Sequence, residues 1–308
     1  MKSRANRIGR LNTISGLVFA TPWMLGFLLF YGYPILVSFY YSLTSFNIFQ
    51  APKFIGLANY RRLFSEAMFY KSLMNTLFIT AFGVPINLLF GLSCAMLLNS
   101  KVRGLSVYRT IFYLPAIIPL VATSILWVWI LDAQFGLVNM ALHLAGLPEP
   151  NWLDDARFTK PALLLIGMWG TGQIAVIFLA ALQDVPVQLY EAADLDGASR
   201  WKKFRHITVP FLSPVILFQI IMGVIAGFQY FTQAYLMVTI RSGLSDPNQA
   251  GGPENSLMFY AMYLFHNAFT YLKMGKASAM AWILFVIISL ITFVLLKSSK
   301  KWVQYGAD

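Results

Sequence analysis

Long apolar runs dominate the chain, and uncharged stretches of about 20 residues recur along it. A hydrocarbon core about 30 Å thick, crossed at about 1.5 Å per residue, requires helices of that length. None of these stretches contains Asp, Glu, Lys, Arg or His, and their prolines predict kinks. The pattern predicts six membrane-spanning helices, at residues 15–44, 73–98, 111–131, 162–182, 211–238 and 277–296.

The basic residues lie unevenly between these spans. Fourteen of the 23 Lys and Arg residues fall in the N-terminal segment, in the second and fourth connections, and in the C-terminal segment. The other nine are spread over the three remaining connections. Because Lys and Arg collect on the cytoplasmic side of a membrane, both termini are expected in the cytoplasm.

Composition supports a membrane protein and excludes several other classes. The chain is 58% hydrophobic and only 11% charged, whereas soluble domains carry roughly 25% charged residues. The net charge of +11 belongs to the connections, so no nucleic-acid partner is expected. One cysteine, Cys94, cannot form an internal disulfide, and His143, His206 and His266 lack metal-ligand spacing. We therefore expect no metal site and no catalytic residues.

The missing charges also limit the mode of transport. Coupling to protons or ions needs a titratable group near the bilayer centre, and a cation channel needs an acidic ring, but the spans offer neither. The chain also lacks the G-x-x-x-x-G-K-[ST] phosphate-binding loop, so it is not expected to hydrolyse ATP. If transport is driven by ATP, the motor is another chain.

The connection at residues 184–210 predicts two short helices. Asp184 is expected to cap the first, Pro186 suits its first turn, and Gly197 suits a left-handed residue at its end. Ser199 is expected to cap the second. Such a pair fits either the lipid headgroups or a groove on a cytoplasmic partner.

The spacing in this loop resembles a known signature. Glu191-Ala192-Ala193, Gly197, and Ile207-Thr208-Val209-Pro210 are similar to the EAA motif (EAA-x3-G-x9-I-x-L-P) of permease subunits in binding-protein-dependent ABC importers, with valine in place of leucine. The resemblance is closest to the carbohydrate, maltose-type branch, and extends to residues 20–22, 33–34, 54–60, 75–77, 113–115, 178–183, 196–198, 251–253 and 277–279. Residues 239–250 depart from the family pattern, as an insertion before Gly-Gly-Pro.

The resemblance implies an all-α membrane protein with six transmembrane helices and type I ABC importer permease architecture. Residues 1–72 would hold the cytoplasmic N-terminus, the first transmembrane helix and an external loop. Residues 73–296 would form the permease domain, with five transmembrane helices and the EAA loop at 184–210. Residues 297–308 would be a cytoplasmic tail. The implied location is the cytoplasmic (inner) membrane of a prokaryote, as a multi-pass protein.

The resemblance also implies partners and an alternating-access mechanism. They are a second homologous permease, two cytoplasmic ATPase subunits that bind ATP and Mg, an extracytoplasmic solute-binding protein, a neutral carbohydrate and membrane lipid. No cofactor is implied on this chain. The short EAA helix would sit in a cleft of the ATPase, with Glu191 as its polar anchor. The implied ATPase-coupling residues are Glu191, Ala192, Ala193, Gly197, Ile207 and Pro210.

Neutral polar residues within the spans suit a polyhydroxylated solute, although hydrogen bonding between helices explains them equally well. They are Asn75, Asn87, Thr171, Gln173, Gln219, Gln229, Thr232 and Gln233. By its position relative to the EAA loop, the family's solute site would include Trp169, Gly170 and Gln173 before the loop and Gly227 and Tyr230 after it. The family often has asparagine at the last two positions.

The residue types in the spans disfavour two other functions. The same machine could carry a polyol or glycerol phosphate, but a phosphate group favours nearby Arg or Lys, and the spans contain none. A membrane-embedded enzyme would need a nucleophile, a base or a metal cluster at the membrane surface, and the sequence offers none. The apolar stretch at 257–269 is too short to cross the membrane and fits an external interfacial helix, a re-entrant segment or a partner contact. The interfacial helix is expected, with His266 as a hydrogen-bonding surface residue.

Overall fold

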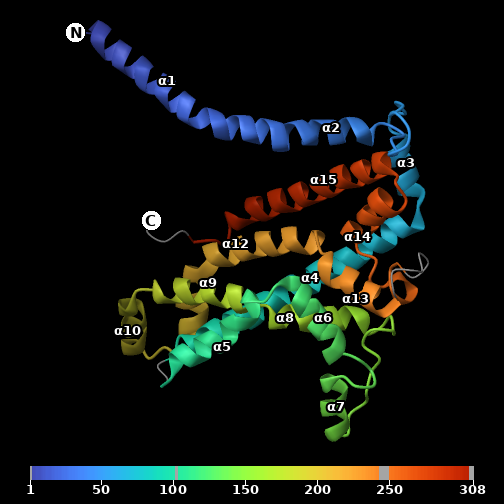
Figure 1. Ribbon diagram of the computed structural model, residues 1–308. Helices are drawn as coiled ribbons and strands as arrows, with labels where there is room; N and C mark the ends of the chain where they lie inside the picture. The colour runs from blue at the N-terminus through green and yellow to red at the C-terminus, as the bar shows by residue number, and fades with distance from the viewer. Residues whose placement is uncertain (1, 101–102, 243–249, 305–308) are drawn as a thin grey trace. The chain divides into compact units, whose positions relative to one another are not determined.

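The computed structural model describes residues 2–100, 103–242 and 250–304. Regular structure in these residues is helical apart from two isolated β-bridges, Thr44–Phe54 and Asn47–Gln50. The chain divides into two compact units, Met1–Ser65 with Phe265–Ile283, and Glu66–Leu264 with Leu284–Asp308. The membrane-length helical segments (Figure 1) are built from α1 (Lys2–Phe27), α2 (Tyr33–Ser42), α4 (Ala67–Leu98), α5 (Leu105–Ile117), α6 (Leu120–Ile130), α8 (Thr159–Trp169), α9 (Gly172–Gln183), α12 (Val209–Phe228), α13 (Thr232–Ser242) and α15 (Met274–Ser299).

These helices agree with six spans, with corrections to three of them. Four segments are long and apolar enough to cross a membrane alone: Ser15–Ser42, Ala67–Leu98, Arg200–Arg241 and Met274–Ser299. The fifth predicted span is interrupted at residues 229–231, between α12 and α13, and the third and fourth are bent pairs of helices. The third consists of α5 and α6, bent by 99°, and the fourth of α8 and α9, bent by 46°. In the third span, Ile118 at the bend has an extended backbone, because the following Pro119 disfavours a helical conformation at the residue before it.

The first unit is organised around the end of α2. The side chain of Asn59, in α3 (Ala58–Ser65), donates to the carbonyl oxygens of Ser42 and Thr44, at 2.8 Å each. Tyr60 donates to the Ser42 hydroxyl at 2.9 Å. The two Asn59 bonds satisfy carbonyls left unpaired at and just after the C-terminus of α2, so the loop after the first span has a defined fold.

In the second unit, α4 is the central helix, packed against α8, α9 and α12. A tightly packed cluster joins α4, α9 and α12 through Ala95, Leu98, Phe178, Leu179, Leu182 and Leu212. Small residues allow the close approach: a Cβ at Gly91 would lie 2.7 Å from the Ile174 side chain. Because lipid provides no hydrophobic force between helices, this packing is what holds them together.

The expectation for residues 257–269 was wrong. Leu257, Phe259 and Tyr260 are at most 1% exposed. They lead into α14 (Tyr260–Phe265), which is followed by a π-turn, η5 (His266–Thr270). His266 is 9% exposed, and its Nδ1 lies 3.1 Å from the Thr270 hydroxyl, so it is not a surface histidine. Length excludes a span, but an apolar run of this length fits a buried segment as well as an interfacial one.

Candidate functional site

The EAA loop contains α10 (Val187–Leu195), which ends as predicted at Gly197. Gly197 has φ +71°, a left-handed conformation that favours glycine. The amide of Ala198 donates to Ala193 O at 2.9 Å, and that of Gly197 donates to Asp194 O at 3.1 Å. These two bonds form the motif in which a glycine closes a helix and satisfies its last carbonyls.

Two other expectations for this loop were wrong. Asp184 is the C-terminal cap of α9 rather than the cap of α10, which starts after Pro186. Ser199 does cap a helix, accepting from the Lys202 amide at 3.3 Å. That helix, α11 (Arg200–Lys203), is not a separate short helix, because it continues through a π-turn, η2 (Phe204–Thr208), directly into α12.

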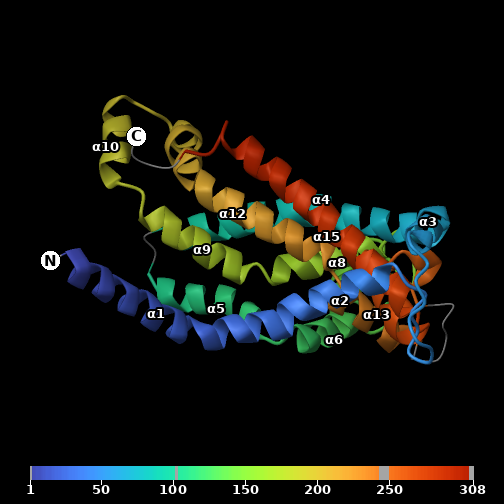
Figure 2. The same cartoon turned by 90° about the horizontal axis from the view of Figure 1, so that it is seen from above.

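The surface of α10 is open. No residue of the helix is buried, and in both views it lies beyond the ends of α9 and α12 (Figures 1 and 2). The Glu191 side chain is exposed and makes no hydrogen bond within the described part of the chain. Beside it, Val187, Leu189 and Leu195 are 63%, 46% and 91% exposed. Ala192 is exposed, whereas Ala193, Ile207 and Pro210 are partly buried. An exposed carboxylate among exposed apolar side chains suits a protein partner.

Three of the predicted pathway residues lie at the break between α8 and α9. Trp169 is the last residue of α8, Gly170 its C-terminal cap, and Gln173 the second residue of α9. All three are exposed, Trp169 by 47%. The indole of Trp169 packs edge-to-face on Trp127, with ring centroids 5.9 Å apart. Backbone breaks at membrane depth occur where they line a cavity or are buried in protein.

The other two predicted pathway residues lie near the break between α12 and α13. A Cβ at Gly227 would lie 2.5 Å from the Thr80 hydroxyl, so this glycine allows α12 to pack closely on α4. The Tyr230 ring is 5.3 Å from Phe259, and its hydroxyl is buried with no hydrogen-bond partner in the described residues. No ring contact or hydrogen bond joins Gly227 or Tyr230 to the Trp169 group in the residues that the structure describes.

Some of the neutral polar residues in the spans hydrogen-bond to the backbone, whereas others have no partner within the described chain. Asn75 bonds the carbonyls of Asn255 and Met258, and the Thr171 hydroxyl bonds Met168 O at 2.8 Å, so these two serve the fold. Asn87 Oδ1 and Gln219 Nε2 are buried without partners in the described chain. Beside Trp169 lies a cavity of about 370 Å³ with an almost wholly apolar lining from Phe90, Cys94, Phe112, Trp127, Met168 and Ala175.

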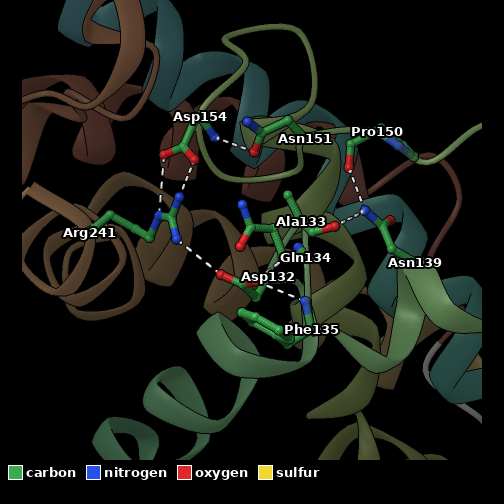
Figure 3. Close-up of polar contacts among 9 residues, drawn as sticks. All are labelled: Asp132, Ala133, Gln134, Phe135, Asn139, Pro150, Asn151, Asp154 and Arg241. Atoms are coloured by element: carbon green, nitrogen blue, oxygen red, sulfur yellow. Dashed lines mark hydrogen bonds and ion pairs between the residues drawn. The ribbon is translucent and has the colours of Figure 1, made fainter.

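Sequence reasoning missed a cluster of charged residues, in which Arg241 from the last turn of α13 meets Asp132 and Asp154 from the loop between α6 and α8 (Figure 3). The guanidinium of Arg241 lies between two carboxylates, with Nη1 3.0 Å from Asp132 Oδ2 and Nη2 paired with Asp154 Oδ2. Backbone amides of Phe135 and Gln134, together with Arg241, hold the pKa of Asp132 below its ordinary value. The sequence offered one signal for this cluster, because Arg241 is the only basic residue in the 239–250 insertion. Its partners could not be predicted, since they lie 87 and 109 residues away along the chain.

The side chain of Asn139 connects distant parts of the loop between α6 and α8. Asn139, in α7 (Leu137–Leu144), donates to Ala133 O at 3.2 Å and to Pro150 O at 3.1 Å, and accepts from Trp152 Nε1 at 2.8 Å. These bonds cross-link the loop that carries Asp132 and Asp154, the two partners of Arg241 (Figure 3). In the described residues, no group of three His, Cys, Asp or Glu side chains could hold a metal ion.

Residues 87–304 match the protein family described as the binding-protein-dependent transport system inner membrane component. The chain belongs to this family. It is 39% identical to the probable ABC transporter permease protein YesP of Bacillus subtilis, over 98% of this chain and 96% of that protein. It is 32% identical to the arabinooligosaccharides transport system permease protein AraP of Bacillus subtilis, over 92% and 87%. It is 31% identical to the lactose transport system permease protein LacF of Rhizobium radiobacter, over 92% and 94%.

Solved structures confirm the fold of this permease. A chain of a bacterial ABC transporter involved in the import of alginate matches it with a TM-score of 0.76 and 23% identity, over 96% of this permease and 99% of that chain. A bacterial alginate ABC transporter in complex with an alginate pentasaccharide-bound periplasmic protein gives a TM-score of 0.77 and 22% identity, over 98% and 99%. The prediction of an all-α membrane protein with type I ABC importer permease architecture is therefore confirmed.

Proposed function

We propose that this permease forms half of the translocation pathway for a neutral sugar or oligosaccharide in an ATP-driven importer. The observation that carries the proposal is the position of the two helix breaks. Trp169, Gly170 and Gln173 lie at the first, and Gly227 and Tyr230 lie next to the second. Interrupted helices expose backbone polar groups, and transporters place their solute sites at such interruptions.

The chemistry at the breaks favours an uncharged cargo. Exposed Trp169 offers an aromatic face on which the C–H groups of a sugar ring pack, and Gln173 offers both a donor and an acceptor for hydroxyls. The relatives AraP and LacF are named for arabinooligosaccharides and lactose. Residues 162–182 and 211–238 contain no Lys or Arg to pair with a phosphate or a carboxylate, which disfavours glycerol phosphate.

In this proposal the permease is not catalytic and works with three kinds of protein partner. A second homologous permease completes the pathway, two ATPase subunits bind ATP and Mg, and an extracytoplasmic solute-binding protein delivers the cargo. Residues 73–296 form the permease domain, preceded by 1–72 and followed by the tail at 297–308. The EAA residues Glu191, Ala192, Ala193, Gly197, Ile207 and Pro210 engage the ATPase through α10. The open surface of α10 supports this role.

The test measures transport by the full complex in proteoliposomes, with the cognate solute-binding protein and a panel of neutral sugars. Trp169→Ala and Gln173→Ala are expected to lower transport of the accepted sugar about 2- to 10-fold while the complex assembles normally, since a stacking face or a hydrogen bond is lost. Trp23→Ala is the control, because Trp23 is also exposed, by 72% against 47% for Trp169, but belongs to α1, a helix that contains neither break. Wild-type transport by both variants, or no sugar transported by the wild type, would contradict the proposal.

A further inference from the structure

Two side-chain contacts connect α10 to the helix that follows it. The Tyr190 and Thr208 hydroxyls share a hydrogen bond of 2.9 Å, and Lys203 Nζ lies 2.6 Å from Asp194 Oδ1. Tyr190 directly precedes Glu191, and Thr208 directly follows Ile207. Tyr190 lies just before the EAA signature and Thr208 occupies one of its unspecified positions, so the signature itself does not define this contact.

The two contacts differ in expected strength. Thr208 is 6% exposed and Tyr190 is partly buried, whereas the side chain of Asp194 is 62% exposed. Ion pairs that are open to water contribute little to stability. Breaking a partly buried hydrogen bond leaves a hydroxyl that water reaches poorly, which costs more. The Tyr190–Thr208 bond is therefore the stronger link.

Within the residues that the structure describes, few other contacts hold α10 at a fixed angle. None of its residues is buried, and its C-terminal end turns at Gly197, where a substituted Cβ would meet no atom within 4 Å. Thr208, by contrast, ends the π-turn that continues directly into α12. Such π-turns often occur at functional sites. A bond to Thr208 thus connects the loosely held α10 to the start of the fifth span.

We propose that Tyr190 and Thr208 form a strut that makes α10 and α12 move as one body. The inference rests on the proposed function, in which the ATPase moves α10. Without the strut, α10 pivots about Gly197 and its movement is not passed to α12 and the break beyond it. Tyr190 and Thr208 are positioning residues, because they act through the helices and touch neither ATP nor cargo.

The experiment measures cargo transported per ATP hydrolysed, using the full complex in proteoliposomes. The variants are Tyr190→Phe, Thr208→Val and their combination, which preserve shape and remove the hydrogen bond. Each should bind the ATPase normally, because the exposed face of α10 is unchanged, and should lower the transport ratio about 2- to 10-fold. The double variant should be no worse than either single one, because all three break the same contact. Thr208→Ser, which keeps the hydroxyl, should retain the wild-type ratio.

The matched controls are Tyr108→Phe and Thr110→Val in α5, which remove the same two hydroxyls from exposed positions and should leave the ratio unchanged. An unchanged ratio in the double variant would overturn the strut, as would losses in the two single variants that simply multiply. Reduced ATPase binding by these variants would also overturn it, since the residues would then belong to the docking surface. Failure of the proposed function is distinct, because the wild-type complex would then transport no sugar on hydrolysing ATP.

Discussion

The side-chain amide of Asn75 lies 3.0 Å from the carbonyl oxygen of Met258, 183 residues later in the chain, and donates to it. The same amide donates to Asn255 O at 2.9 Å. Next to it, the Thr76 hydroxyl accepts from the amide of Tyr260 at 2.8 Å. One turn of α4 therefore satisfies buried backbone groups of the segment that follows Gly-Gly-Pro, which explains how this segment is held in the interior.

Asn75→Ala is expected to destabilise the permease by about 1–3 kcal/mol, because two buried carbonyls lose their donor. Thermal unfolding of the purified protein in detergent measures the effect. Asn87→Ala is the matched control on the same helix: Asn87 Oδ1 has no partner in the described residues, so losing it should cost less. Equal destabilisation by the two variants would show that the bonds of Asn75 contribute nothing specific.

Gly227→Ala is expected to destabilise the contact between α12 and α4, because the new Cβ would lie 2.5 Å from the Thr80 hydroxyl. Combining it with Thr80→Ala should restore much of the lost thermal stability. Gly170→Ala provides the control, since its nearest atom would be 3.7 Å away. If the double variant regains stability but not transport, Gly227 also borders the pathway. If Gly227→Ala alone is as stable as Gly170→Ala, the close packing is not needed.

These contacts mark the limit of what the sequence could predict. Span positions followed from apolar length, and the conformation of Gly197 followed from local spacing, because both depend on neighbouring residues. The 99° bend at Ile118 was predicted only as a proline kink, since the bend angle depends on packing. The burial of Tyr260 and the pairing of Arg241 with Asp132 depend on contacts between distant segments, which no local pattern encodes.

The Arg241 cluster should stabilise the loop between α6 and α8 over a broad pH range. The pKa of Asp132 is lowered in the folded protein, so its contribution is present above the ordinary aspartate pKa of about 3.9 and is lost as pH falls through the lower folded value. The stability difference between wild type and Asp132→Asn should therefore be constant from neutral pH to about pH 4 and shrink below it. Thermal unfolding across this range tests the prediction. A difference that disappears between pH 7 and 5 would contradict it.

The charge distribution predicts the orientation of the chain. In a Cys94→Ala background, single cysteines at Ser45 or Asn151 should react with a membrane-impermeant maleimide added to intact cells. Cysteines at Ser106 or Gln188 should react only after the cells are opened, because fourteen of the 23 basic residues lie on their side of the membrane. Labelling of the cysteine at 188 from outside would overturn both this topology and the coupling role of α10.

The last prediction tests docking of the EAA helix itself. Glu191→Ala should lose ATPase co-purification or solute-stimulated hydrolysis about tenfold to a hundredfold, because a hydrogen bond to a charged group contributes roughly 1.5–3 kcal/mol. Gln188→Ala, an exposed change on the same helix, is its control. Gly197→Leu should have a similar effect, because a side chain at φ +71° strains the turn that positions α10.

Gly104→Leu is the matched control for Gly197→Leu, since Gly104 also has a left-handed φ of +76° and a Cβ would likewise meet no atom within 4 Å. Both leucines impose comparable local strain, but only the one at 197 reorients α10, so only it should uncouple the ATPase. Membrane insertion should be normal in every variant, because no span is altered. Wild-type ATPase binding and stimulated turnover in both Glu191→Ala and Gly197→Leu would mean that α10 is merely interfacial, and the coupling role would have to be assigned to another cytoplasmic segment.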